Sequence, residues 1–350
     1  MDRGIVRGAR YLAAAGALTA FACGDDGGGN AGGPLTCAEL DCGQLNRSCV
    51  ETDGVAECGS CLPGFMPGFG GVCDPDGGMN ASLGECGSLE LSTESPRTRR
   101  VDFSRDIVEP IVVAPALTRR DPEPAHPRVA SVDRRGFSVE IEEWNYLDGV
   151  HGTERLDWVA VPAGRGVWTD DAPFEAGAVE VGADPVEVRF EDAVPAPRVW
   201  ASEVTRNGGA PVVVRLSDLS GTGFSLRLQR EEAAEDPPVA ETVHWLAVAS
   251  APNDPDRARW AVGRLTGVTD QPAELQSRLM QAGLSNPAAL IVFMSSFNGG
   301  DTAWARLIER SESDPIRVFV EEEQSSDGET GHTEEQIDWL ACPELGPFDR

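Results

Sequence analysis

The chain carries several short stretches in which apolar and polar residues alternate with a period of two. In residues 137–142, and again in residues 224–229, every second residue is Phe, Val, Leu or Ile and the residues between are polar. This pattern is typical of a β-strand with one face in a core and the other in water. Apolar runs at 111–114, 158–161 and 212–214 add short strands, separated by Pro, Gly and Asp residues. We therefore predict an all-β fold.

The strand pattern is repeated along the sequence. Residues 103–158 match residues 190–245 without insertion or deletion, so each matched residue recurs 87 positions later. A third, looser copy ends the chain. One segment differs, because Pro272 and the spacing of the apolar residues in 270–284 predict a helix that introduces the third copy. The repeat predicts three tandem units of similar structure.

An arginine, a glutamate and a tryptophan recur in every copy. The tryptophans lie in apolar strands, so we assign them to the core. The arginines and glutamates invite a ligand-binding or catalytic role, but we favour a cross-strand ion pair that fixes the register within each sandwich. These residues are Arg128, Glu154 and Trp158, then Arg215, Glu241 and Trp245, then Arg306, Glu335 and Trp339.

The N-terminus has the features of an export signal. Three arginines precede an apolar run at residues 11–22, which is too short to span a bilayer stably. Ala20 and Ala22 permit cleavage after Ala22, and Cys23 follows where a bacterial lipoprotein would carry its lipid. The segment resembles a lipobox, although Ala20 stands where leucine is usual. We expect lipidation at Cys23, with secretion of an unlipidated chain as the alternative.

Cysteine number and spacing predict disulfide bonds. Nine cysteines in an exported chain leave one unpaired, and lipidation of Cys23 would leave an even eight. Six of the eight crowd into a Gly-rich stretch that has too few apolar residues to fold by burial alone. These six are Cys37, Cys42, Cys49, Cys58, Cys61 and Cys73. Pairing of the other two, Cys86 and Cys342, would clasp the ends of the repeat region.

The six-cysteine stretch resembles an EGF-like module. Leu-Pro-Gly-Phe follows its fifth cysteine, although two residues separate the fourth and fifth cysteines where most such modules have one. The spacing leaves the connectivity open. Residues 33–36 carry no acidic side chain where calcium-binding members of that family have them, so we predict no calcium site there. Zinc is not favoured, since the close pair Cys58 and Cys61 lies inside the module.

Charge and motifs argue against several functions. A net charge of −29 would repel nucleic acid and anionic membrane surfaces at long range. The sequence has no nucleophile motif, no phosphate-binding glycine loop and no zinc-hydrolase spacing among its four histidines. We therefore predict no enzymatic activity, no cofactor and no metal site.

The repeats resemble H-type lectin domains. The likeness rests on Gly136 and Phe137 at the start of an alternating strand, on the aromatic-bearing loop that follows, and on the strand at 158–161. The resemblance implies six-stranded antiparallel β-sandwiches, assembly as a parallel trimer, and binding of sugars similar to N-acetylgalactosamine. Three copies in one chain could form an intramolecular pseudo-trimer, and a row of three units is the alternative.

The resemblance also indicates a candidate carbohydrate site in the first copy. The family uses an aromatic residue followed by histidine; here Trp144 matches the aromatic residue and Asn145 replaces the histidine. Aromatic rings stack on pyranose faces, and carboxylates and amides bind hydroxyl groups, so Tyr146, Asp148 and His151 complete the candidate site. The alternative is a turn capped by Asp and Gly with a surface histidine.

The second copy lacks this chemistry, because Glu231 and Glu232 occupy the positions of the aromatic residue and its neighbour. We expect a lipoprotein of the outer membrane or cell surface, attached to the membrane only by its lipid, that binds glycans or a cell-surface protein in adhesion. The alternative is a structural or protein-interaction module whose sandwiches have lost sugar binding. The predicted order is a signal peptide at 1–22, a lipid anchor and tether at 23–36, the cysteine module at 37–73, a linker at 74–100, and sandwiches at 101–182, 183–264 and 265–350.

Overall fold

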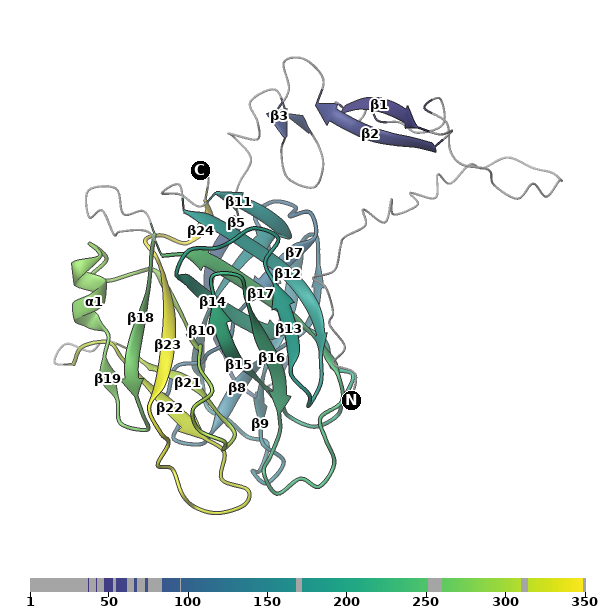
Figure 1. Ribbon diagram of the computed structural model, residues 1–350. Helices are drawn as coiled ribbons and strands as arrows, with labels where there is room; N and C mark the ends of the chain where they lie inside the picture. Colours follow the sequence, from purple (N-terminus) through teal and green to yellow (C-terminus); the bar gives the residue numbers. More distant parts are fainter. Residues whose placement is uncertain are drawn as a thin grey trace. The chain divides into compact units, whose positions relative to one another are not determined.

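The chain forms two compact units that divide between residues 81 and 82 (Figure 1). The computed structural model describes residues 37, 42, 47–52, 55–61, 66–67, 73–74, 84–94, 96–167, 172–250, 260–309 and 314–348. The predicted export signal, Cys23 and the tether lie outside the described residues. Within those ranges, no helix is long and apolar enough to cross a bilayer.

The N-terminal unit is held together by disulfide bonds. One bond joins Cys37 to Cys49 and another joins Cys42 to Cys58, so the first cysteine pairs with the third and the second with the fourth. These bonds confirm the prediction of disulfides in this stretch. Its strands, in two antiparallel pairs, are β1 (Arg47–Thr52) with β2 (Val55–Cys61) and β3 (Met66–Pro67) with β4 (Cys73–Asp74).

The first repeat is a sandwich of two antiparallel sheets, with the strand orders β5-β10-β7 and β6-β9-β8. Phe137, Val139 and Ile141 point from β9 into the space between the sheets and pack with Leu156 and Trp158 of β10. The alternation along β9 is thus the pattern of a core face. The strands are β5 (Gly84–Leu91), β6 (Arg99–Asp102), β7 (Pro110–Val113), β8 (Ala125–Asp133), β9 (Gly136–Glu143) and β10 (Glu154–Pro162).

The second and third repeats have the same two-sheet arrangement, which confirms the predicted tandem six-stranded sandwiches. The second repeat contains β12 (Pro173–Val181), β13 (Val186–Arg189), β14 (Pro197–Glu203), β15 (Val213–Ser220), β16 (Gly223–Gln229) and β17 (Glu241–Ala249). The third contains β18 (Ala261–Val268), β19 (Ala273–Glu274), β20 (Ala289–Met294), β21 (Ala303–Ile308), β22 (Arg317–Glu322) and β23 (Glu335–Cys342). The predicted helix is present but short, as α1 (Gln276–Gln281).

Each repeat begins one strand earlier than the matched sequence segments indicate. Strands β5, β12 and β18 pair along most of the tryptophan-bearing strand of their own repeat, so the expected starts at 101, 183 and 265 are too late. A glycine in each first strand faces the tryptophan ring; a Cβ on Gly177 would lie 2.8 Å from the ring of Trp245. The glycine–tryptophan pairs are Gly87 with Trp158, Gly177 with Trp245 and Gly263 with Trp339.

The three sandwiches close into a ring and do not form a row. Strand β11 (Gly164–Val167), which follows the first repeat, adds to β12 of the second repeat. Strand β24 (Gly346–Phe348), which follows the third repeat, adds to β5 of the first. The predicted disulfide between Cys86 and Cys342 is confirmed and ties the same two repeats together. The end of the repeat region is therefore fastened to its beginning.

One side chain from the last strand of each repeat accepts a hydrogen bond from a backbone N–H of a neighbouring repeat. The three N–H groups occupy equivalent places, opposite Ala160, Ala247 and Ala341 in their own sheets. This cyclic order gives the ring a threefold pseudo-symmetry. The donor and acceptor pairs are Val112 N with His244 Nδ1 at 3.1 Å, Val199 N with Asp338 Oδ2 at 2.9 Å and Leu290 N with Asp157 Oδ2 at 2.7 Å.

Candidate functional site

The recurrent arginine and glutamate of each repeat meet at the interfaces between repeats. All six side chains are buried, and each arginine pairs with the glutamate of the next repeat in the ring. Our expectation of pairing within one sandwich is therefore wrong. The ion pairs are Arg128 with Glu241 at 2.9 Å, Arg215 with Glu335 at 3.3 Å and Arg306 with Glu154 at 3.1 Å.

The geometry of β8 explains this outcome. Side chains alternate between the two faces of a strand, and Ala125 and Val129 belong to the core of the first sandwich. Arg128 and His126 therefore point out of that sandwich, toward the neighbouring repeats. The arginine also lies 3.8 Å from Glu142 of its own repeat.

Each of these glutamates is held by a cage of donors that recurs in all three repeats. In the first repeat, the hydroxyl of Thr118 donates to Glu154 at 2.5 Å, and the backbone N–H groups of Arg120 and Asp121 donate at 3.0 and 2.9 Å. The same hydroxyl accepts a hydrogen bond from the N–H of Arg155. Thr205 does the same for Glu241, and Ser296 does the same for Glu335.

The donors determine the charge state of the caged carboxylates. Burial alone would raise the pKa of Glu335, but hydrogen bonds from His332, the N–H groups of Gly299 and Asn298 and the hydroxyl of Ser296 outweigh it and lower the pKa to about 2. At Glu154, burial likewise raises the pKa, but the hydrogen bonds outweigh this effect, and the pKa is lowered. Glu154 and Glu335 are therefore ionised at neutral pH and act as fixed anions between the repeats.

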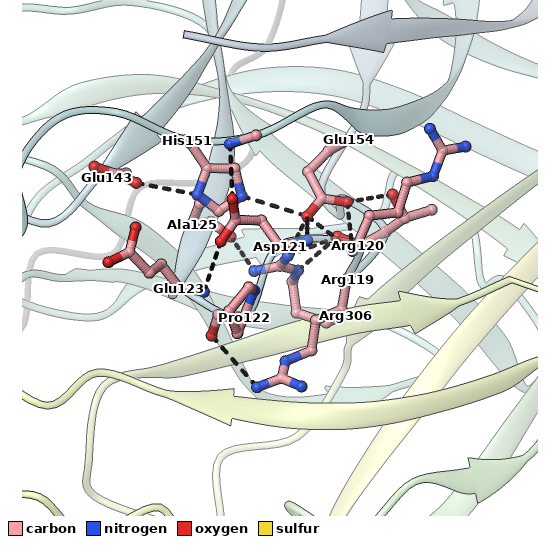
Figure 2. A network of polar contacts seen from close by, with 12 residues as sticks. Arg119, Arg120, Asp121, Pro122, Glu123, Ala125, Glu143, His151, Glu154 and Arg306 are labelled. Carbon is pink, nitrogen blue, oxygen red and sulfur yellow. Dashed lines mark hydrogen bonds and ion pairs between the residues drawn. The ribbon is translucent and has the colours of Figure 1, made fainter.

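A histidine lies between two carboxylates in the first repeat (Figure 2). His151 is 3.0 Å from Glu143 through Nδ1 and 3.3 Å from Glu154 through Nε2. Burial opposes the protonated form, but the hydrogen bonds to Glu154 and Glu143 prevail, and the pKa of His151 is raised. Both ring nitrogens are engaged and the side chain is buried, so the imidazole cannot reach a ligand.

The third repeat has the same chain of groups and the second does not. His332 lies 3.3 Å from Glu335 and 3.4 Å from Glu322. In the second repeat, Pro238 and Arg230 occupy the positions of the histidine and of its second carboxylate. The Arg–Glu pair and its hydroxyl are thus common to three interfaces. A histidine held between two carboxylates, which we call the histidine relay, occurs in only two repeats, as His151 and His332.

Trp144 is buried at the centre of the ring, with 1 % of its surface exposed. Its ring lies 4.9 Å from that of His126 and 5.3 Å from that of Trp304, and Val213 of the second repeat belongs to the same cluster. The indole therefore offers no open face for a sugar. The prediction of a stacking role for Trp144 is not met, because the strand that precedes it faces other repeats and not solvent.

The other residues of the predicted carbohydrate site are dispersed. Tyr146 is 40 % exposed, and its hydroxyl accepts a hydrogen bond from the N–H of Gln324 in the third repeat. Asn145 is exposed and donates to Glu231 of the second repeat. Asp148 is exposed and caps the N–H of Val150. The loop thus bridges to both neighbouring repeats.

A groove of about 290 Å³ lies between the first and third repeats. Arg119 borders it from the first repeat, with its guanidinium 5.4 Å from the ring of Phe319. Gln324, Thr330 and Glu322 border it from the third repeat. Its hydrogen-bonding groups come from two repeats, so no single sequence segment signals it.

Comparison with protein families, with curated proteins and with solved structures gives no match to this chain. Its functional interpretation rests on the internal geometry described above.

Proposed function

We propose that this protein is a non-enzymatic interaction module of a cell surface, in which a rigid ring of three sandwiches displays its loops to a partner. The proposal rests on the burial of the side chains that could otherwise bind or react with a ligand. The ionised Glu154 is buried in an ion pair with Arg306 of the third repeat, and His151 is buried beside it. Trp144 fills the centre of the ring. Such groups stabilise an assembly and are closed to substrates.

The location of the protein is part of the same proposal. Disulfides persist in oxidising compartments, and bonds in both units agree with export. Lipidation at Cys23 would attach the ring to a membrane through the N-terminal segment, and the acidic net charge of −29 would keep the ring in solution near an anionic surface. The cysteine module, which resembles EGF-like modules, would act as a stiff spacer.

A second candidate function is glycan binding, as the resemblance to H-type lectin domains implies. The groove between the first and third repeats favours it, since its volume of about 290 Å³ approaches the lower limit of ligand pockets, roughly 300 Å³. Arg119, Gln324 and Thr330 offer donors and acceptors of the kind that bind hydroxyl groups.

One experiment separates the two candidates. Beads coated with the exported protein are counted under flow on intact bacterial cells, and on the same cells after periodate has cleaved the vicinal diols of their glycans. Retention that survives periodate supports a protein partner. Retention that is lost with periodate, and that falls in Gln324→Ala but not in the exposed-surface variant Glu180→Gln, supports glycan binding in the groove. Equal retention of beads carrying reduced, unfolded protein contradicts both.

A further inference from the structure

Two groups of three carboxylates lie outside the caged glutamates, one in the first repeat and one between the second and third repeats. In each group, one oxygen from every carboxylate lies within 4.8 Å of the others. The first group is Glu123, Glu143 and Asp148, and the second is Glu232, Asp301 and Glu322.

Register shows that the two groups are equivalent. Glu143 ends β9 and faces Ala125, while Glu322 ends β22 and faces Ala303. Glu123 and Asp301 each lie two residues before that alanine. The third carboxylate differs in origin, since Asp148 comes from the loop of its own repeat and Glu232 comes from the second repeat. The same arrangement has therefore been assembled twice.

The innermost carboxylate of each group has an unsatisfied oxygen. The Glu143 side chain is 1 % exposed, and its Oε2 has no hydrogen-bond partner among the described residues. Glu322 Oε2 also has no hydrogen-bond partner within that part of the chain, and it lies 3.4 Å from His332 Nδ1. A buried carboxylate oxygen without a donor is costly unless a cation compensates it.

The electrostatics of both groups are those of crowded anions. Burial and then Glu143 and Asp148 raise the pKa of Glu123. Burial and then Asp301 raise the pKa of Glu322 to about 7, against the effect of His332. Repulsion between carboxylates at such distances is relieved when a positive charge lies among them.

The second repeat provides a natural contrast. At the positions of Glu123 and Glu143 it has Ala210 and Arg230, and only Glu235 remains, at the position of Asp148. A guanidinium thus stands where the other two repeats have their innermost carboxylate, so this repeat has neither the anionic group nor the need for a bound cation.

We propose that each of the two carboxylate groups binds one divalent cation, and that the cation is Ca²⁺. The donors are all oxygens, which Ca²⁺ prefers, and both nitrogens of His151 are already engaged by Glu143 and Glu154. Asp148 and Asp301 are exposed, so water can complete the coordination. In the second group the ion would also join the second repeat to the third through Glu232.

The test is calorimetric titration of the chelator-treated, full exported chain with CaCl₂. We expect two ions per chain, with dissociation constants on the order of 10⁻⁴ to 10⁻³ M, as in other extracellular calcium modules. Asp148→Asn should weaken one site at least tenfold, and Asp301→Asn should weaken the other. Both residues are exposed, so these variants keep the fold, which their melting temperatures in chelator check. Glu235→Gln is the matched control and should bind as the unchanged chain does.

Two results would overturn the proposal. One is the absence of binding heat, and of any rise in melting temperature, at about 10 mM Ca²⁺, tenfold above the weakest expected dissociation constant. The other is full Ca²⁺ binding by the variant that carries both Asp148→Asn and Asp301→Asn, which would locate the ions elsewhere. If only one of the two single variants, Asp148→Asn or Asp301→Asn, loses an ion, the site at that residue is supported and the other site is rejected.

Discussion

The second repeat and its two neighbours share one interface design but differ in what surrounds it. Each interface has a buried Arg–Glu pair, such as Arg128 with Glu241 and Arg306 with Glu154, and a hydroxyl that bridges the glutamate to the backbone. The first and third repeats add a histidine and a group of carboxylates, and the second has Pro238 in the histidine's place.

This difference separates two kinds of residue. What all three interfaces share is needed to close the ring, because the second repeat closes with nothing more. The histidines and the carboxylate groups, which only two interfaces have, are not required for closure. The carboxylate groups are free to serve a ligand, and the buried histidines can tune stability. The predictions below test that division.

The largest effect should come from the shared pair. Arg306→Met removes the cation that Glu154 faces and leaves a buried charge without its partner, which should lower the free energy of unfolding by about 3–5 kcal/mol. Chemical denaturation measures it. The matched control is Arg119→Met, which removes a 41 % exposed arginine and should cost less than about 1 kcal/mol. Equal losses in the two variants would contradict a special role for the buried pair.

Removal of the disulfide that fastens the third repeat to the first should be the next largest effect. The variant carrying Cys86→Ser and Cys342→Ser should lose about 2–5 kcal/mol, since the bond closes a loop of 256 positions. Denaturation of this variant, compared with the unchanged chain under reducing and oxidising conditions, measures the loss. A variant as stable as the oxidised chain would show that β24 and the interfaces close the ring without help.

A smaller loss should follow from filling the space opposite a core tryptophan. Gly177→Ala would place a methyl group 2.8 Å from the Trp245 ring and should cost about 1–3 kcal/mol through overpacking. Gly209→Ala is the control, because no atom lies within 4 Å of the added carbon. Thermal unfolding compares the two, and a larger loss at Gly209 would be inconsistent with the packing described.

The histidine relay should have the smallest effect, visible as pH dependence. The raised pKa of His151 gives stability that is complete below about pH 6.5, the unfolded value, and is lost as pH rises through the folded pKa. Burial raises the pKa of Glu203 to about 7, so its contribution also disappears between about pH 4.5 and 7. At the acid end, Glu335, with a pKa of about 2, loses its contribution as pH falls below about 4.5.

The melting temperature should therefore be highest near about pH 5 and should fall by a few degrees toward pH 8. His151→Gln should reduce the fall, since the contribution of His151 is gone while those of the buried glutamates remain. Scanning calorimetry across this range decides the matter, and an unchanged slope in the variant would assign the pH dependence to other groups.

Much of the fold could be predicted from the sequence, and most of the site could not. Alternation at 137–142 identified the core face of β9, and cysteine parity identified the bond between Cys86 and Cys342. Alternation says that a strand has two faces but not what covers the second one. The sequence did not show that other repeats cover the outer face of the strand before Trp144, so we expected Trp144 at the surface.

The carboxylate groups were missed for a related reason. Glu123, Glu143 and Asp148 come from three separate segments, and Glu232 reaches its group from a different repeat. The fold of the first repeat brings the first group together, and the ring brings Glu232 to the second. A signal was present in the sequence, since Glu143 and Glu322 occupy equivalent positions and Arg230 replaces them in the second copy. Its meaning depended on knowing which positions are equivalent in space.

The central claim is that each recurrent Arg–Glu pair joins different repeats, and a double-mutant cycle tests it most directly. The cycle of Arg306→Met with Glu154→Gln should give a coupling energy of at least about 1.5 kcal/mol, because the two groups are buried and 3.1 Å apart. The cycle of Arg306→Met with Glu335→Gln, both in the third repeat, should be additive within about 0.5 kcal/mol. Strong coupling within the repeat and none across it would contradict the ring.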